Sequence, residues 1–169
     1  MTIHLKGRAR VLGDDINTDY IISSSRKKET LDTEVLKQYL LEAVDPHFAA
    51  SVQEGDLLVA GKNFGCGSAM EIAVTVLLAA GIKAVLAQSF ARTFYRNAIN
   101  NGLLPVECET SEIAEGDRLS LILAEGIVRV KNETKAQEIS GNPLPKIMLD
   151  ILATGGLVPY FRKHHDFLV

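Results

Sequence analysis

The spacing of apolar and polar positions predicts a succession of short strands and helices. Near the N-terminus the two kinds of position alternate, as along a strand with one buried face, and three later apolar runs are typical of strands buried on both faces. Two further segments flank Glu125-Gly126 and predict a hairpin. The predicted strands are Thr2–Leu12, Asp56–Ala60, Ile82–Ala87, Leu103–Cys108, Asp117–Ala124 and Ile127–Lys131. Pro105 places the fourth of these strands near a sheet edge.

Apolar residues three and four positions apart predict helices between these strands. Gly81 and Gly102 stand where a left-handed residue ends a helix, and Asp45-Pro46 stops the first one. Ser89 is expected to cap the third helix. The predicted helices are Thr33–Val44, Ala69–Ala80, Phe90–Asn101 and Pro145–Thr154.

The order of these elements indicates the fold class. A strand–turn–helix–strand–helix–strand order in the middle of the chain favours a right-handed α/β unit with parallel strands, and the later hairpin makes the sheet mixed. The segment Ser23–Lys28 is polar without periodicity and predicts an exposed loop, while the tail Arg162–Val169 is expected at the surface or facing a partner. Because no repeat or low-complexity segment interrupts the chain, we expect a single domain over residues 1–169.

Composition and charge exclude several classes of protein. The 169 residues are 47% hydrophobic and 23% charged, a balance that excludes intrinsic disorder and a disulfide framework. A net charge of −3 gives no general attraction to nucleic acid or to an anionic membrane. The apolar runs fall far short of the roughly 20 residues that span a bilayer, and the N-terminus lacks the apolar block of a signal peptide. We therefore expect a cytoplasmic protein without a nucleic-acid or membrane partner.

The glycine-rich turn Gly61–Ser68 carries the strongest chemical signal. Its glycines permit backbone angles that other residues avoid and allow a ligand to approach the main chain. The predicted helix that follows directs its free amides and the positive end of its dipole towards a ligand at Ser68. The expected ligand is therefore an anion, such as a carboxylate or a phosphate. Ser68 either faces that ligand or caps the helix. Neither the phosphate-loop spacing nor the dinucleotide fingerprint occurs here.

Cationic residues offer two further candidates for binding anions. Arg26 and the two lysines after it form a basic arm, and an arginine fork suits a carboxylate better than a lysine does. Arg92 and Arg96 are four residues apart on one helix and form a basic ridge that faces a partner or an acidic neighbour. For both groups the alternative is a solvated basic surface.

Nucleophiles and metal ligands are weakly indicated. Cys66 has no neighbouring histidine to raise its thiolate fraction, and the only other cysteine is Cys108. With two cysteines and no CxxC pair, a metal site built by this chain alone is not expected. The aspartates of Gly13–Asp19 are interpreted as turn residues, because the spacing lacks the later glutamate of a calcium loop. The scattered histidines are expected to be structural or at the surface.

Four motifs together resemble one family. They are Gly13-Asp14-Asp15-Ile16-Asn17-Thr18-Asp19, Asn63-Phe64-Gly65-Cys66-Gly67-Ser68, Ser89-Phe90-Ala91-Arg92 and Phe94-Tyr95-Arg96-Asn97. In this order they resemble the small subunit of the isopropylmalate isomerase/homoaconitase group, the separate-chain version of the aconitase swivel domain. The resemblance covers nearly the whole chain, through Gly155-Gly156-Leu157.

The resemblance implies a fold, a reaction and a partner. The implied fold is a swivelling β/β/α domain, in which a mixed sheet forms a partial barrel flanked by helices. The implied reaction is reversible dehydration of a hydroxy di- or tricarboxylic acid, most often 3-isopropylmalate of leucine biosynthesis or a related alkylmalate. A [4Fe–4S] cluster on a large partner subunit acts as the Lewis acid, so this chain binds no cofactor itself and works in a heterodimer or heterotetramer.

The same resemblance implies roles for particular residues. Ser68 abstracts the proton beside the substrate carboxylate, and Gly67, Ala69 and Met70 line the substrate with it. Arg26 lies in the loop that helps to choose the substrate. A serine is a weak base, so its alkoxide must be stabilised by the helix N-terminus and neighbouring cations.

One departure from the family bears on the substrate. The family commonly has Gly-Ser-Ser-Arg-Glu where this chain has Gly67-Ser68-Ala69-Met70-Glu71, so a hydroxyl and a guanidinium are absent. Each hydrogen bond to a charge contributes about 1.5–3 kcal/mol. Either the substrate is apolar at that point, or Arg26 or the large subunit supplies the cation, or activity is lost. The alternatives are therefore a subunit for homoaconitate or another 2-hydroxy acid, or a non-catalytic carboxylate-binding regulatory module. A free-standing enzyme that uses Cys66 is a distant third possibility.

Overall fold

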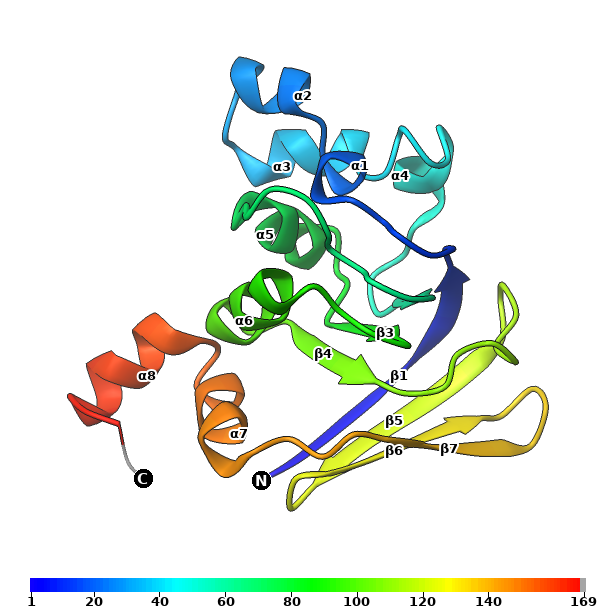
Figure 1. Cartoon of the computed structure of the whole chain (residues 1–169), viewed down its shortest axis with the longest axis vertical. Coiled ribbons are helices and arrows are strands. Elements are labelled where there is room, and N and C mark those ends of the chain that lie inside the picture. Colours follow the sequence, from blue (N-terminus) through cyan, green and yellow to red (C-terminus); the bar gives the residue numbers. More distant parts are fainter. Residues whose placement is uncertain (168–169) are drawn as a thin grey trace.

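The fold is built on one mixed sheet of seven strands, seen here in a computed structural model that describes residues 1–167 (Figure 1). The strand order is β4-β3-β2-β1-β5-β6-β7, in which β1 to β4 run parallel and β5 to β7 pair antiparallel. The strands are β1 (Thr2–Val11), β2 (Leu57–Ala60), β3 (Ala84–Ala87), β4 (Leu104–Glu107), β5 (Arg118–Ala124), β6 (Ile127–Asn132) and β7 (Gln137–Gly141). The sheet curls into a half-barrel flanked by helices, which confirms the predicted fold class and the edge position of β4.

Helices cover both faces of the parallel half, because its strands are apolar on both sides. All four side chains of β2 are buried, with Leu58 and Ala60 in one hydrophobic cluster and Leu57 and Val59 in another. The helical segments are α1 (Thr18–Ile21), α2 (Ser24–Glu29), α3 (Thr33–Leu36), η1 (Lys37–Tyr39), α4 (Phe48–Ser51), α5 (Ile72–Ala79), α6 (Arg92–Asn101), α7 (Lys146–Ala153) and α8 (Leu157–His164). None of the helices within residues 1–167 is long and apolar enough to cross a membrane.

Two sequence predictions near the N-terminus are wrong. The segment predicted as a loop contains α2, which starts because the Ser23 hydroxyl accepts a hydrogen bond from the Arg26 amide. The helix predicted over Thr33–Val44 is broken into α3 and η1. Leu41 adopts a left-handed φ of 56° and donates its amide to the Ile21 carbonyl, because the fully buried side chains of Leu40 and Leu41 leave the helical path to fill the core.

Two predicted helix starts lie too early in the chain. The helix expected from Ala69 begins only at Ile72, with Glu71 at the N-cap position, so Ser68 does not cap it. The helix expected from Phe90 begins at Arg92, and the Ser89 hydroxyl instead accepts a hydrogen bond from the Asn63 amide at 2.8 Å. In both places the residues before the helix are held by tertiary hydrogen bonds that periodicity does not reveal.

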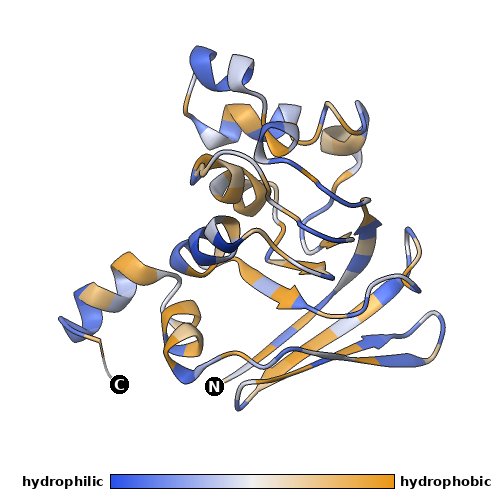
Figure 2. Cartoon of the chain, in the orientation of Figure 1, coloured by the Kyte–Doolittle hydropathy of each residue, from blue (hydrophilic) through white to orange (hydrophobic). Residues whose placement is uncertain are grey.

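The C-terminal part of the chain contains elements that the pattern missed. Strand β7, whose only large apolar residue is Ile139, pairs with β6, and α8 carries the buried Tyr160. Arg162–His164, expected in a surface tail, are the last residues of α8, while residues 168–169 lie outside the described part. Figure 2 shows α5 as mainly apolar and α6, which lies between α5 and α7, as mainly polar.

Candidate functional site

The site is assembled where the glycine turn lies between two other segments. Backbone bridges join Cys66 to Asn17 and Phe64 to Phe90. The Gly65 amide donates to the Ile16 carbonyl at 2.8 Å. Motifs that are far apart in the sequence therefore meet around one turn, which ends at Ser68.

The glycines of this turn are required by their backbone angles and their neighbours. Gly65 has a φ of +79°, and a Cβ there would lie 2.2 Å from Phe94 Cγ. Gly67 has a φ of +91°, and its Cβ would lie 2.5 Å from Asn17 Oδ1. Left-handed angles and close backbone packing both favour glycine at these positions. The turn is therefore held rigidly against α6 and the start of α1.

Thr18 fixes the position of Ser68. The buried Thr18 hydroxyl donates a hydrogen bond to the Ser68 carbonyl at 2.8 Å, and the Thr18 amide donates to the Cys66 carbonyl at 2.8 Å. Ser68 itself is exposed, and no hydrogen bond within residues 1–167 engages its hydroxyl. The Ser68 backbone is thus anchored while its side chain stays available to a ligand.

A small open cavity collects the predicted residues around Ser68. Gly67, Ala69 and Met70, the residues expected to contact the substrate, line it together with Ser68. Its volume is about 60 Å³, room for only about two water molecules. Sequence reasoning missed Thr18, Thr93 and Asn97, which also line it. The spacing of Thr93 and Asn97 by one helical turn is a signal from which these two were predictable.

Arg26 does not line this cavity. Its guanidinium donates two hydrogen bonds to the Glu42 carboxylate, at 2.9 and 3.1 Å, and lies 3.8 Å from the centre of the Tyr39 ring. The hydrogen bonds to Glu42 raise the pKa of Arg26. The cation from α2 that reaches the turn is the neighbouring Lys27, whose ammonium group contacts the Met70 sulfur.

Arg92 is the cation that lines the cavity itself. It is exposed and belongs both to the Ser68 cavity and to a second one on the other side of α6. Neither Arg92 nor Arg96 forms a side-chain hydrogen bond or ion pair within the described residues. Their placement on one exposed face agrees with the ridge predicted from the sequence.

The remaining sequence candidates have structural roles. The aspartates accept hydrogen bonds from nearby turn residues, as Asp14 does from the Lys62 amide at 2.7 Å, and hydrogen bonds from Ser24 lower the pKa of Asp19. Burial raises the pKa of the Cys108 thiol to about 12. No group of three metal-binding side chains occurs within residues 1–167. No histidine lines the Ser68 cavity.

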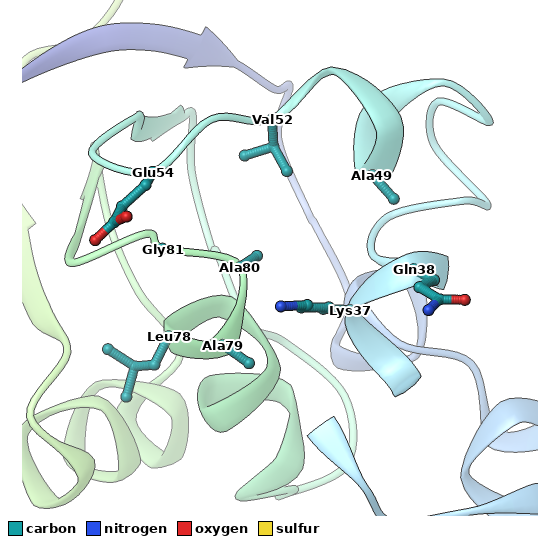
Figure 3. Close-up of a pocket in the computed structure, with 9 residues that line it drawn as sticks. All are labelled: Lys37, Gln38, Ala49, Val52, Glu54, Leu78, Ala79, Ala80 and Gly81. Atoms are coloured by element: carbon teal, nitrogen blue, oxygen red, sulfur yellow. The ribbon is translucent and has the colours of Figure 1, made fainter. Parts of the chain in front are cut away.

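A larger cavity lies away from this chemistry. It has a volume of about 450 Å³ and sits at the C-terminal end of α5, the end opposite Ser68 (Figure 3). Lys37 extends towards Ala80 there and also pairs with Glu34. A lysine beside the free carbonyls of a helix end is a stabilising arrangement. Size alone therefore does not locate the functional site.

Comparisons with known proteins agree with this geometry. The family described as "Aconitase C-terminal domain" matches residues 14–111. A 3-isopropylmalate dehydratase small subunit of Archaeoglobus fulgidus is 45% identical over 96% of this chain and 98% of its own. A methanogen homoaconitase small subunit of Methanocaldococcus jannaschii is 44% identical over 94% of this chain and 92% of its own.

A solved structure extends the similarity to three dimensions. The crystal structure of a 3-isopropylmalate dehydratase from Methanocaldococcus jannaschii superposes with a TM-score of 0.91 and 42% identity, covering 96% of each chain. The matched region 14–111 contains the turn at Ser68 and both segments that enclose it. The chain belongs to the aconitase C-terminal domain family, among the 3-isopropylmalate dehydratase small subunits.

Proposed function

We propose that this chain is the small subunit of a hydro-lyase that isomerises 3-isopropylmalate or a related alkylmalate, with Ser68 as the group that moves the substrate proton. The observation that carries this proposal is the unengaged hydroxyl of Ser68, which lines a small cavity and whose backbone is anchored by Thr18. A relative whose match covers 96% of this chain and 98% of its own carries the name of such a small subunit. We place the enzyme in the cytoplasm.

The main chain after Ser68 supports binding of a carboxylate. The amides of Ala69, Met70 and Glu71 donate to no backbone carbonyl within residues 1–167, and they directly precede α5. They lie between Ser68 and the first turn of α5, and successive free backbone amides favour an anion. They also supply the positive potential that lowers the cost of an alkoxide on Ser68.

The proton transfer follows from this arrangement. Ser68 Oγ, as an alkoxide, accepts the proton from the carbon beside a substrate carboxylate and becomes a hydroxyl, while the neighbouring carbon loses hydroxide to give the unsaturated acid. In the return direction the same hydroxyl gives its proton to the carbon that lost hydroxide, and hydroxide adds to the carbon that lost the proton, so that Ser68 becomes an alkoxide again. The [4Fe–4S] cluster proposed for the large subunit would supply Lewis-acid assistance to the leaving hydroxyl. The described residues of this chain do not provide its ligands.

The size of the cavity supports a shared site. At about 60 Å³ it is much smaller than the 300–1,000 Å³ of typical ligand pockets. A hydroxy diacid therefore needs walls from a second chain, as the word subunit in the relatives' names also implies. Both a heterodimer and a heterotetramer are compatible with this requirement.

Ala69 and Met70 support an alkyl-bearing substrate. Both residues line the cavity, and neither offers a charged donor. The ammonium group of Lys27 contacts the Met70 sulfur, but Lys27 itself does not line the cavity. An alkyl group packs against the side chains of Ala69 and Met70, whereas a carboxylate placed against them would find no charged partner in them. Homoaconitate is the alternative substrate, favoured by the name of the methanogen relative.

Two variants test this proposal in the complex with the large subunit. Ser68→Ala should assemble normally and lose at least about 100-fold in turnover, the order of effect of an acid–base group. Near-normal turnover of an assembled Ser68→Ala complex would refute the role of Ser68. The double change Ala69→Ser, Met70→Arg should shift the kcat/KM preference from 3-isopropylmalate towards homoaconitate. An unchanged preference would contradict the specificity argument, and measurable binding without turnover of any acid would favour the regulatory module.

A further inference from the structure

We propose that the Arg92–Arg96 face of α6 docks an acidic segment of the large subunit, an inference that rests on the proposed function. The two arginines lie one helical turn apart and line a cavity of about 390 Å³. The other lining residues are Phe90, Tyr95 and Glu107. This cavity adjoins the Ser68 cavity, because Arg92 lines both.

The charges on this face have no partner in the chain. Both arginines are exposed, and neither is engaged by an acceptor within residues 1–167. The first turn of α6 contains no acidic residue that would offset them. Arg8 pairs with Asp56 at 2.8 Å and Arg26 with Glu42 at 2.9 Å. Arg118, Arg129 and Arg162 also form no side-chain ion pair within residues 1–167, so the distinctive feature of Arg92 and Arg96 is that two unpaired arginines lie one helical turn apart on one helix. Two unpaired guanidinium groups beside each other form a fork that suits carboxylates.

The aromatic side chains add a surface on which a segment can rest. Phe90 is 9% exposed, and its ring packs edge-to-face on Tyr95 with 5.7 Å between the ring centres. Burial, with a smaller effect of Glu107, raises the pKa of Tyr95, so its hydroxyl remains a hydrogen-bond donor. Glu107, which also lines the cavity, accepts a hydrogen bond from the Asn142 side-chain amide at 3.0 Å.

These groups determine the chemistry of the occupant. The two guanidinium groups and the Tyr95 hydroxyl are complementary to acidic side chains. The rings of Phe90 and Tyr95 are complementary to apolar groups that lie between those acids. A small substrate at Ser68 does not meet the whole set, because Tyr95, Arg96 and Glu107 line only the second cavity. The large subunit must approach Ser68 to complete the site, and this face adjoins that edge. Docking here would therefore position the partner beside the catalytic serine.

Binding of the purified large subunit to the full small subunit tests the proposal. Arg96 is the position to change, because Arg92 also lines the Ser68 cavity. At low salt, Arg96→Glu should raise the dissociation constant at least tenfold, mainly through a slower association rate, and the difference should shrink at 0.5 M salt. Arg129→Glu, the same change at an exposed site on β6, should alter the constant less than twofold. Equal effects of the two variants, or none from Arg96→Glu, would overturn the proposal.

Two further measurements separate this inference from the others. If Arg96→Glu lowers the unfolding midpoint, the neutral change Arg96→Gln should still weaken binding, by less than the charge reversal, and failure to do so would overturn the proposal. Ser68→Ala should bind the large subunit as tightly as the unchanged chain. An active Ser68→Ala complex would thus refute the proposed function while the effect of Arg96→Glu on binding still stands. Loss of turnover in a saturated Arg96→Glu complex with unchanged affinity would instead assign the arginine to the substrate.

Discussion

Replacing Gly65 with alanine should destabilise the chain more than the same replacement at a glycine that also has a left-handed φ but has free space around its Cβ position. At a φ of +79° the methyl group itself costs about 1–2 kcal/mol, because left-handed angles bring Cβ close to the backbone. The new Cβ would also lie 2.2 Å from Phe94 Cγ. Phe94 is 2% exposed and packs edge-to-face on Phe64 with 5.0 Å between the ring centres, so it has little room to move.

The two contributions set the expected size of the effect. Overpacking a core typically costs about 1–3 kcal/mol, so Gly65→Ala should lower the free energy of unfolding by about 2–5 kcal/mol in total. Gly116 provides a matched control, because its φ is +84° and a Cβ there would meet no atom within 4 Å. Gly116→Ala should therefore cost only the backbone part, about 1–2 kcal/mol.

Urea unfolding followed by circular dichroism measures both variants. The midpoint of Gly65→Ala should fall further than that of Gly116→Ala, at an unchanged denaturant slope. The turnover of folded Gly65→Ala with the large subunit should also fall, since Phe94 lines the Ser68 cavity. Equal destabilisation by the two variants would refute the argument that the turn is locked against α6.

Two further predictions concern buried titratable groups. Asp56→Asn should lower the free energy of unfolding by about 1.5–3 kcal/mol, because it removes the buried carboxylate that pairs with Arg8 at 2.8 Å and with Arg10 at 3.5 Å, while Arg10 keeps Glu115 at 2.7 Å; a loss below 1 kcal/mol in urea unfolding would contradict this. Burial acts to raise the pKa of Asp56, but hydrogen bonds and the charges of Arg8 and Arg10 hold it below the usual value. Its stabilising effect is therefore complete above the unfolded value of about 3.9 and is lost as pH falls through the folded pKa, so acid unfolding curves of Asp56→Asn should be flatter below pH 4. At pH 8 a thiol reagent should modify the half-buried Cys66 in the native chain and reach Cys108, whose pKa is about 12, only on unfolding; rapid native labelling of two thiols would show that Cys108 is accessible.

Local pattern was sufficient for elements whose burial follows a simple period. The alternation in β1 and in the hairpin of β5 and β6 predicted strands with one buried face, and the structure confirms them. The helix stops at Gly81 and Gly102 are also confirmed, since both glycines adopt left-handed angles. These features depend on residues close together in the sequence. The residue types of the glycine turn likewise identified Ser68 as the candidate, and the structure brings the predicted residues around it into one cavity.

Tertiary contacts decided what the pattern could not. Helix α2 forms from a polar segment, and it was the pairing of Arg26 with Glu42 that removed this guanidinium from the turn. Ser68 is separated from α5 because Thr18 holds its carbonyl from another segment. The chemistry of a single residue and the short repeat of apolar positions along a strand or helix depend only on residues that are close together in the sequence. The direction of a side chain depends on partners 16 to 50 residues away, and only folding brings those partners into contact.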